Sequence, residues 1–356
     1  MKKLLCLLLT LLMFPCALAE DAPDPVDALS SDELHTLVEA LFQAASGVKE
    51  WDELTLWKSL TAAEQETRGL ENAAYRALTF PFLRDVFAVE AASAEPADTS
   101  ESAEPADIAE PAVTLADSYA ALSGNAFGQA YLALLVPLGG TDAESALDVT
   151  RAILRRWLDE IDHEKLAGIN EDYRCWIYAP NTPIDYPVVQ CANNSYYLTR
   201  MFNRKSNPAG TLFMDYRNLP DLADPNTLIF GHHMRDGSMF ESLTDYDGAG
   251  YFEAHPFMVL IRADAVYLVE VFAAYVTDGK DICYDIALSD EEDMRVLIGH
   301  ALDKSDFDAH VEVDPSADRL VTLSTCTYVF DNARYVVLGR LTEVATVLPD
   351  TADFSE

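Results

Sequence analysis

The chain is short of positive charge. Its 356 residues include 24 Lys and Arg against 60 Asp and Glu, which gives a formal net charge of −36. Proteins that bind nucleic acid need a basic surface to neutralise phosphates, and electrostatic attachment to anionic lipid needs one as well. The composition therefore argues against both kinds of partner, and a soluble, self-repelling surface is the simplest interpretation of the acidity.

Cysteine is scarce, and its spacing is irregular. Two of the six cysteines fall in the hydrophobic N-terminal segment, and four are spread along the rest of the chain: Cys6, Cys16, Cys175, Cys191, Cys283 and Cys326. The sequence has no C-x-x-C pair and no Cys/His cluster at the spacing of a zinc site. It therefore predicts neither a disulfide framework nor a metal centre, and nothing in it supports a bridge between Cys175 and Cys191.

Long hydrophobic runs are missing too. The apolar run at residues 4–14 follows the positive start Met1-Lys2-Lys3 and precedes Ala17-Leu18-Ala19, which fits a small-residue cleavage site. The run is shorter than the about 20 residues that a membrane span needs, so we expect residues 1–19 to be a secretory signal peptide. A retained membrane anchor is the alternative. Lipid attachment through Cys16 is disfavoured, because small residues do not precede it.

Residues 20–91 have the pattern of a small helical region. Ser31 is placed to cap a helix, with Glu33 in its first turn. Apolar residues then recur at helical spacing in three stretches: Leu34, Leu37, Val38, Leu41 and Phe42; Trp51, Leu54, Trp57 and Leu60; and Tyr75, Leu78, Phe82, Val86 and Phe87. These stripes predict the core of a bundle, and none of them indicates a ligand site.

A repetitive tract at residues 92–112 separates this region from the rest. The segment Ala94-Glu95-Pro96-Ala97-Asp98 recurs at 103–107 and, in part, at 109–112. An Ala/Glu/Pro-rich tract cannot bury a core, so we expect a disordered, self-repelling linker. It is the clearest domain boundary in the sequence.

Residues 113–168 are again helical in pattern. The apolar segment at 131–138 is stopped by Gly139-Gly140. Residues 142–169 predict one long amphipathic helix, in which Thr150 is the one polar residue of the apolar stripe. We expect this helix to pack on the outside of the domain that follows.

From residue 169 to 345 the pattern changes to short, β-rich segments. Eight candidate strands with few helices between them predict a mainly β fold that closes into a barrel. The strands are expected at 175–178, 187–190, 211–215, 227–231, 257–262, 266–276, 320–326 and 335–341. A helix that begins near Asp290 is expected in the interruption at 281–311, and residues 346–356 form a tail.

The candidate reactive residues lie at the ends of three of these strands. One strand ends on Cys326, and the turn Asp331-Asn332 reverses the chain so that the next strand starts at Arg334. An upstream strand ends just before His232-His233. A thiolate nucleophile, a histidine general acid/base and a cation that stabilises an oxyanion together suit acyl transfer.

Two rivals for these roles are weaker. Arg340 could replace Arg334, but it lies a whole strand length away from Cys326. Adjacent strand residues point to opposite faces, so His232 and His233 are not expected to bind one metal ion together.

Ordered sequence blocks in this part of the chain resemble class B sortases. The most telling is Leu323-Ser324-Thr325-Cys326 followed by Arg334, together with Gly231-His232 at the end of its apolar strand. The blocks occur in the family's order at 181–190, 196–198, 213–218, 229–240 and 323–334. Each block alone is weak, but the ordered set over residues 165–344 is specific. It does not extend to residues 20–91.

This resemblance implies an activity and a location. Sortases are cysteine transpeptidases of Gram-positive bacteria that act outside the cytoplasm and join secreted proteins to the cell envelope. The resemblance implies a sortase-type β-barrel with N-terminal helices and a helix before the cysteine strand. It implies no cofactor, and class B members generally bind no calcium. The expected partners are secreted proteins with a C-terminal sorting motif and an amine of the peptidoglycan peptide.

The resemblance also assigns roles to residues. Cys326 is implied as the nucleophile, His232 as the general acid/base, and Arg334 with the backbone N–H of Thr327 as the oxyanion donors. Three further residues occupy positions that line the family's substrate groove: Asn218, Phe230 and Ser324. Phe230 departs from the tyrosine often found just before Gly-His, so a hydroxyl contact is lost there.

Two other functions remain open on the sequence alone. Water in place of an amine would make the chain a cysteine peptidase, since the same thioester would then be hydrolysed. A non-catalytic envelope scaffold, with the helical region as its working part, is the second alternative. The intact set of His232, Cys326 and Arg334 argues against it. The sequence specifies neither the sorting motif nor the acceptor amine.

Overall fold

The computed structural model describes residues 24–49, 53–87 and 113–346. The predicted signal peptide or anchor, Trp51, the linker at 92–112 and the C-terminal tail lie outside these ranges. The helices are η1 (Pro25–Ala28), α2 (Ser31–Ala45), α3 (Glu53–Ser59), α4 (Ala62–Phe87), α5 (Leu115–Gly124), α6 (Ala126–Leu135), η2 (Val136–Leu138), α7 (Ala143–Asp159), α8 (His163–Ile169), η3 (Tyr196–Thr199), η4 (Glu241–Asp247), α9 (Tyr251–Ala254), η5 (Ile282–Tyr284) and α10 (Glu291–Lys304). The strands are β1 (Tyr173–Tyr178), β2 (Asp185–Val189), β3 (Leu212–Met214), β4 (Asn226–Phe230), β5 (Phe257–Ile261), β6 (Ala265–Asp278), β7 (Arg319–Cys326) and β8 (Ala333–Thr346).

The eight strands close into a barrel in the spatial order β1-β2-β3-β4-β7-β8-β6-β5. The pairs β2/β3 and β4/β7 are parallel, and the other neighbours are antiparallel. Each strand lies at a position that the alternation of the sequence predicts, and the closed barrel confirms the mainly β fold. The parallel β4/β7 pair brings together two segments that are far apart in the chain.

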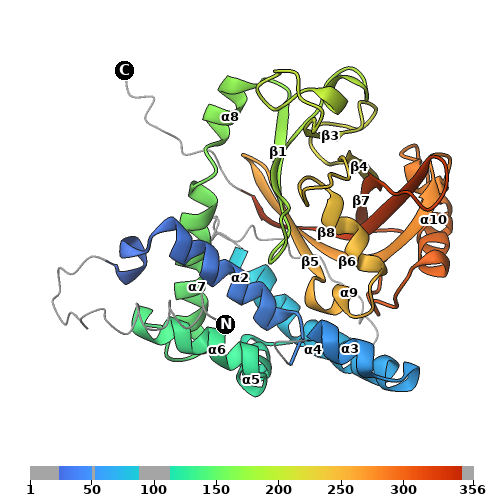
Figure 1. The fold of residues 1–356 in the computed structure, drawn as a ribbon. Coiled ribbons are helices and arrows are strands. Elements are labelled where there is room, and N and C mark those ends of the chain that lie inside the picture. The colour runs from blue at the N-terminus through green and yellow to red at the C-terminus, as the bar shows by residue number, and fades with distance from the viewer. Residues whose placement is uncertain (1–23, 50–52, 88–112, 347–356) are drawn as a thin grey trace, which may run out of the picture.

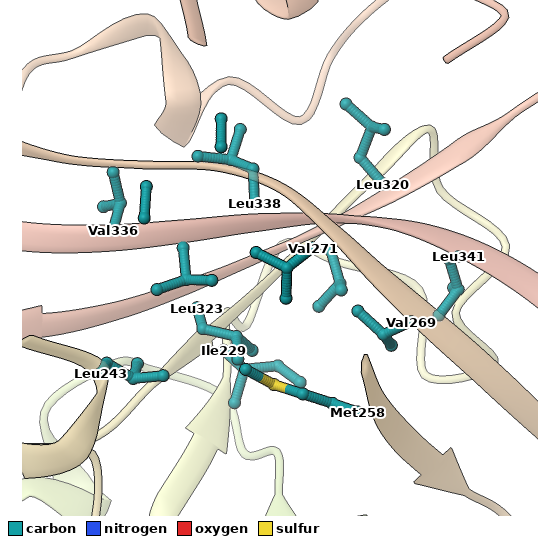
Figure 2. Packing of buried hydrophobic residues seen from close by; sticks show 14 of the residues in the cluster. Ile229, Leu243, Met258, Val269, Val271, Leu320, Leu323, Val336, Leu338 and Leu341 are labelled. Atoms are coloured by element: carbon teal, nitrogen blue, oxygen red, sulfur yellow. The ribbon is translucent and has the colours of Figure 1, made fainter. Parts of the chain in front are cut away.

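Side-chain alternation along the strands divides the barrel into an interior and an outer face. Ile229, Val269 and Leu323 are buried in the interior cluster, as Figure 2 shows. Because successive strand residues point to opposite faces, Phe230 and Ser324 point outward beside them. This parity decides which side chains of β4 and β7 can meet a substrate.

The N-terminal helices form a second hydrophobic core against one side of the barrel (Figure 1). Leu37 of α2, Phe82 of α4, Tyr131 of α6 and Leu154 of α7 are buried together with Leu268 of β6 in one cluster. The stripe of α2 and most of the stripe of α4 therefore do form a bundle core, whereas Leu78 is exposed and Trp57 of the second stretch is buried outside this cluster. That core is continuous with the outer face of the barrel.

Two helical details differ from the sequence-based expectation. The helix predicted over 142–169 is broken into α7 and α8, because Asp162 accepts a hydrogen bond from the Lys165 N–H and starts a new helix. Helix α2 is capped by Ser30, not by Ser31, and Glu33 completes the capping box from the third helical position.

Helix α10 follows β6 and packs on the outside of the barrel, away from the N-terminal helices (Figure 1). Asp290 caps it through the Asp293 N–H, and three acidic residues in its first turn favour the helix dipole. Met294 and Leu297 are buried on its inner side. The helix expected in the connection before the cysteine strand is thus confirmed.

No single helix in the described ranges has both the length and the apolar composition of a membrane span. The pair Leu115–Gly124 and Ala126–Leu138, bent by 111°, passes that test jointly. Phe127, Tyr131 and Leu135 of this pair are buried in the helical core.

Candidate active site

The β7–β8 hairpin places a thiol beside a guanidinium. Cys326 and Arg334 are directly paired across the two antiparallel strands, so both side chains project from the same face. The turn between them has Asn332 at φ 62°, a left-handed conformation that asparagine tolerates well. The pairing inferred from the strand ends is therefore present in the structure.

The parallel neighbour β4 brings a histidine to the same rim. Phe230 is in register with Ser324, and the Gly231 N–H donates to the Ser324 carbonyl at 3.0 Å. His232 follows two residues after the last paired residue of β4, and Cys326 ends β7, so both lie where these parallel strands end. The β7/β8 register adds Arg334 beside Cys326. His232, Cys326 and Arg334 therefore lie at the same rim of the barrel, and these three residues are called the row below.

The His232 ring is held by a backbone carbonyl. Its Nε2 lies 2.7 Å from the carbonyl oxygen of Leu198. A carbonyl can only accept a hydrogen bond, so Nε2 carries a proton and Nδ1 is the atom left for proton transfer. Leu198 thus provides the orientation that a carboxylate supplies in many catalytic triads, and no such carboxylate was evident in the sequence.

The segment that carries Leu198 is itself anchored. Tyr197, which is buried, donates its hydroxyl to Asp172 at 2.6 Å, and its carbonyl accepts from the Thr211 N–H. Arg204 binds the same Asp172 at 3.1 Å. The carbonyl that orients His232 is therefore part of a rigid network, which the sequence did not indicate.

Exposure separates Cys326 and Cys191 from the two buried cysteines, and the Cys191 thiol donates to the Asn193 carbonyl at 3.3 Å. Within the described residues all four cysteines are free thiols, and Cys175 and Cys283 are fully buried. Burial raises the pKa of the Cys175 thiol to about 12, so it forms no thiolate near neutral pH. Cys326 is partly exposed at the end of its strand, where a substrate can reach it.

Arg334 is free of acidic partners in the described ranges, although the chain is strongly acidic. Its guanidinium donates only to the carbonyl of Ala333, at 3.0 Å. The rival Arg340 pairs instead with the carboxylate of Glu270 and lies beside Leu320, at the other end of β7. The cation available at the rim is therefore Arg334.

Two stacked aromatic rings lie next to the row. Phe230 stacks on Tyr284 of η5 with ring centroids 6.2 Å apart and planes 12° apart. The Tyr284 hydroxyl lies 2.9 Å from Ser324 Oγ. Sequence reasoning missed Tyr284, and the hydroxyl that Phe230 lacks is supplied close by from this other segment.

A buried carboxylate fixes the connection that carries Tyr284. Asp281 accepts hydrogen bonds from the Thr277 hydroxyl, Lys304 Nζ and the Cys283 N–H, at 2.6, 2.7 and 3.0 Å. Burial alone would raise the pKa of Asp281, but these bonds and one to His300 outweigh it and hold the pKa well below its usual range. Thr277 is itself in register with Arg334 on β8, so its side chain lies beside that of Arg334 on the same face.

Two residues expected at the substrate site occupy other environments. Asn218 is buried near the start of β4, where its side chain binds Asp224, the Asn226 carbonyl and the Leu228 N–H. It lies away from the rim that carries His232. The Thr327 N–H, the expected second oxyanion donor, is used by the Ala333 carbonyl at 3.1 Å. Among the residues expected to line the groove, the structure therefore brings Phe230 and Ser324 to the row and leaves Asn218 elsewhere.

The second histidine has a different setting. The Nδ1 of His233 is buried and lacks a hydrogen-bond partner in the described ranges. Its ring contacts the edge of Tyr328, whose own side chain is 76% exposed on the β7–β8 loop. Asp236 caps its own loop through Ser238, so it does not complete a triad. No group of three or more His, Cys, Asp or Glu in the described parts of the chain could hold a metal ion.

The chain is similar to known proteins over this barrel. A family model described as a sortase domain matches residues 177–342. Sortase B of Listeria monocytogenes is 34% identical over 178 residues, which cover 49% of this chain and 72% of that protein. Sortase B of Staphylococcus aureus is 33% identical over 184 residues, which cover 51% and 75%.

Solved structures give the same result. A mutant form of Clostridium perfringens sortase B has a TM-score of 0.50 at 31% identity and covers 53% of this chain and 90% of that chain. A crystal structure of sortase B complexed with triglycine has the same TM-score and identity and covers 53% and 92%. The closed barrel and the sequence relatives agree, and the chain therefore belongs to the sortase family as a class B member, a cysteine transpeptidase.

Proposed function

We propose that this transpeptidase cleaves a C-terminal sorting motif in secreted proteins and transfers them to an amine of the cell-wall peptidoglycan. The observation that carries the proposal is the placement of His232, Cys326 and Arg334 at one rim of the barrel, where β4 and β7 end beside the start of β8. The guanidinium of Arg334 supports it further, since no carboxylate in the described residues neutralises it.

The first half-reaction forms a thioester. The Cys326 thiolate attacks the carbonyl carbon of the scissile amide, and the negative charge that develops on its oxygen is stabilised by Arg334. The imidazolium of His232 gives the proton on Nδ1 to the departing amine while Nε2 stays bound to Leu198. The C–N bond then breaks, and the acyl group remains on sulfur.

The second half-reaction transfers the acyl group. Neutral His232 now has a free Nδ1, which removes a proton from the incoming amine as nitrogen attacks the thioester carbonyl. The thiolate leaves, and a new amide is formed. A related sortase B has been solved with triglycine, which supports a glycine amine as the first acceptor to try.

The face beside the row suits an extended peptide. Phe230 stacks on Tyr284, and the Tyr284 hydroxyl lies 2.9 Å from the buried Ser324 Oγ, so the accessible part of this cluster is aromatic. We assign substrate contact to Phe230 and add Tyr284, whose hydroxyl is held by the buried Ser324. Asn218 supports the start of β4 instead, and the Thr327 N–H becomes an oxyanion donor only if the β7–β8 loop releases it.

The location follows from the activity. A sorting substrate and a peptidoglycan acceptor meet outside the cytoplasm, so we place the enzyme in the cell envelope. The segment at residues 1–19 acts as a secretory signal or as a membrane anchor in this proposal.

The test uses the full chain and its Cys326→Ala variant, each incubated with a pool of sorting-motif peptides and analysed by mass spectrometry. A thioester adduct on Cys326 alone, which disappears when triglycine is added and yields ligated peptide, is expected. Cleavage without ligation to triglycine or a diamino acid would replace the proposal with a peptidase. Equal peptide cleavage by the Cys326→Ala variant would overturn the role of this cysteine.

A further inference from the structure

A buried ion pair joins the N-terminal helices to the barrel. Arg76 of α4 lies 2.8 Å from Glu253 of α9, and their side chains are 5% and 4% exposed. Asn72, one turn earlier on α4, donates to the same carboxylate oxygen at 2.8 Å. Arg76 also donates to the carbonyls of Ser46 and Ala309, so its fork connects α4 to three other segments.

The buried Arg76–Glu253 pair fixes how α4 and α9 are placed relative to each other. Desolvation offsets most of the attraction within a buried ion pair, but its directional hydrogen bonds allow one relative placement of the two helices. A second contact lies next to it, because a Cβ added to Gly250 would come within 2.6 Å of the Trp57 side chain of α3. Helix α9 is thus held by α3 and α4, and Figure 1 shows it near these helices at the edge of the barrel.

A short series of packed residues connects α9 to His232. Tyr251 of α9 contacts Tyr246 of η4 edge-on, with ring centroids 4.9 Å apart. Phe240, which is fully buried, immediately precedes η4 and donates its N–H to the His232 carbonyl at 3.0 Å. The ring of Phe240 is so close to Gly231 that an added Cβ there would lie 2.6 Å from it. A displacement of α9 therefore reaches the backbone that carries the imidazole.

We propose that the N-terminal helices act as a clamp that positions His232, and that Arg76 and Glu253 are positioning residues of the transpeptidase. The inference rests on the proposed pairing of His232 with Cys326. It gives a role in the chemistry to helices that lie outside the matched sortase domain, which spans residues 177–342. Movement of a catalytic group by about 1 Å is enough to lower a rate by on the order of 100-fold. A small shift of His232 on loss of the Arg76–Glu253 pair would therefore change the reaction rate measurably.

The test needs no peptide substrate. Iodoacetamide is added to the full chain over a range of pH values, and the alkylation rate of the peptide that contains Cys326 is followed by mass spectrometry. The wild type and the His232→Ala variant define two pH profiles, because the imidazole changes the thiolate fraction of a paired cysteine. The pH profile of the Arg76→Met variant is expected to shift from that of the wild type towards that of His232→Ala. The profile of the milder Arg76→Lys variant is expected to shift in the same direction.

Two controls separate positioning from general loss of stability. Leu154→Ala weakens the helical core from α7 and leaves the Arg76–Glu253 ion pair in place. Its pH profile is expected to match that of the wild type at temperatures below its unfolding midpoint. Glu71→Gln removes an exposed ion pair of α4 and is expected to change nothing. An Arg76→Met profile equal to the wild type, or an equal shift in Leu154→Ala, would overturn the clamp alone. Identical profiles for His232→Ala and the wild type would overturn both the clamp and the proposed pairing.

Discussion

At the scale of single residues, Arg334 offers the most direct test of the proposed mechanism. It is a cation without a carboxylate partner in the described residues. Arginine presents several donors in a fixed plane, whereas lysine offers a single mobile ammonium. We expect Arg334→Lys to lower the rate of adduct formation with the sorting peptide on the order of 100-fold, the usual effect of removing an oxyanion donor. Single-turnover mass spectrometry measures this rate.

The matched control for that variant is Arg340→Lys. Arg340 is bound to Glu270 and lies at the other end of its strand pair, so adduct formation at a temperature well below unfolding should change less than twofold. A wild-type rate in Arg334→Lys would remove the guanidinium from the proposed mechanism.

The hydroxyl pair of Tyr284 and Ser324 allows a second test at the scale of single residues. Both side chains are largely buried and lie 2.9 Å apart, so removing one hydroxyl leaves the other without its partner. A double-mutant cycle with Tyr284→Phe and Ser324→Ala should give a coupling of about 1 kcal/mol in the free energy of unfolding. Urea denaturation of the four proteins measures it, and strict additivity would argue against the bond.

At the scale of elements, the end of β4 depends on a glycine. A Cβ on Gly231 would lie 2.4 Å from Leu212 and 2.6 Å from Phe240, so Gly231→Ala forces both side chains to move. We expect it to lower the free energy of unfolding by about 1–3 kcal/mol, as overpacking does, and to slow adduct formation because His232 follows directly. Gly299→Ala on the open side of α10 meets no atom within 4 Å and should stabilise by about 1 kcal/mol. Equal effects of the two substitutions on unfolding would contradict this packing.

The connection that carries Tyr284 gives a pH-dependent prediction. The pKa of Asp281 in the folded chain is held below its unfolded value, so its stabilising contribution is present above about pH 4 and fades as the pH falls further. We expect Asp281→Asn to lower the free energy of unfolding at pH 7 by roughly 2–3 kcal/mol. The difference from the wild type should shrink steadily below pH 4. Denaturation at several pH values tests the sign, and a difference that grows on acidification would refute it.

Much of the fold and of the candidate site could be predicted from the sequence, because the signals lie in short, local segments. Alternating β-rich segments predicted all eight strands. Residues at strand ends indicated His232, Cys326 and Arg334 as the candidate site, of which the β7/β8 register pairs Cys326 with Arg334. Tyr284 and the Leu198 carbonyl could not be found in this way, because they belong to irregular segments that only the tertiary fold brings to the rim. Asn218 was assigned by its place in a motif, but its side chain is used to hold the start of β4.

At the scale of the whole molecule, the helical core and the barrel share buried surface. The cluster that contains Leu37 and Phe82 also contains Val259 of β5 and Leu268 of β6. Melting the helices would expose these strand residues, so the two parts should unfold together. Calorimetry of the full chain is expected to show one transition, with similar calorimetric and van't Hoff enthalpies. Two well-separated transitions would mean that the helices and the barrel are thermodynamically independent.

The parallel pairing of β4 with β7 also affects the order in which the chain folds. These strands are separated by about ninety residues, and closing so long a loop is slow and entropically unfavourable, so such contacts form late in folding. Until they form, the chain holds Cys326 without the imidazole beside it. The same topology that builds the candidate site thus delays the pairing of Cys326 with a histidine until the chain has folded.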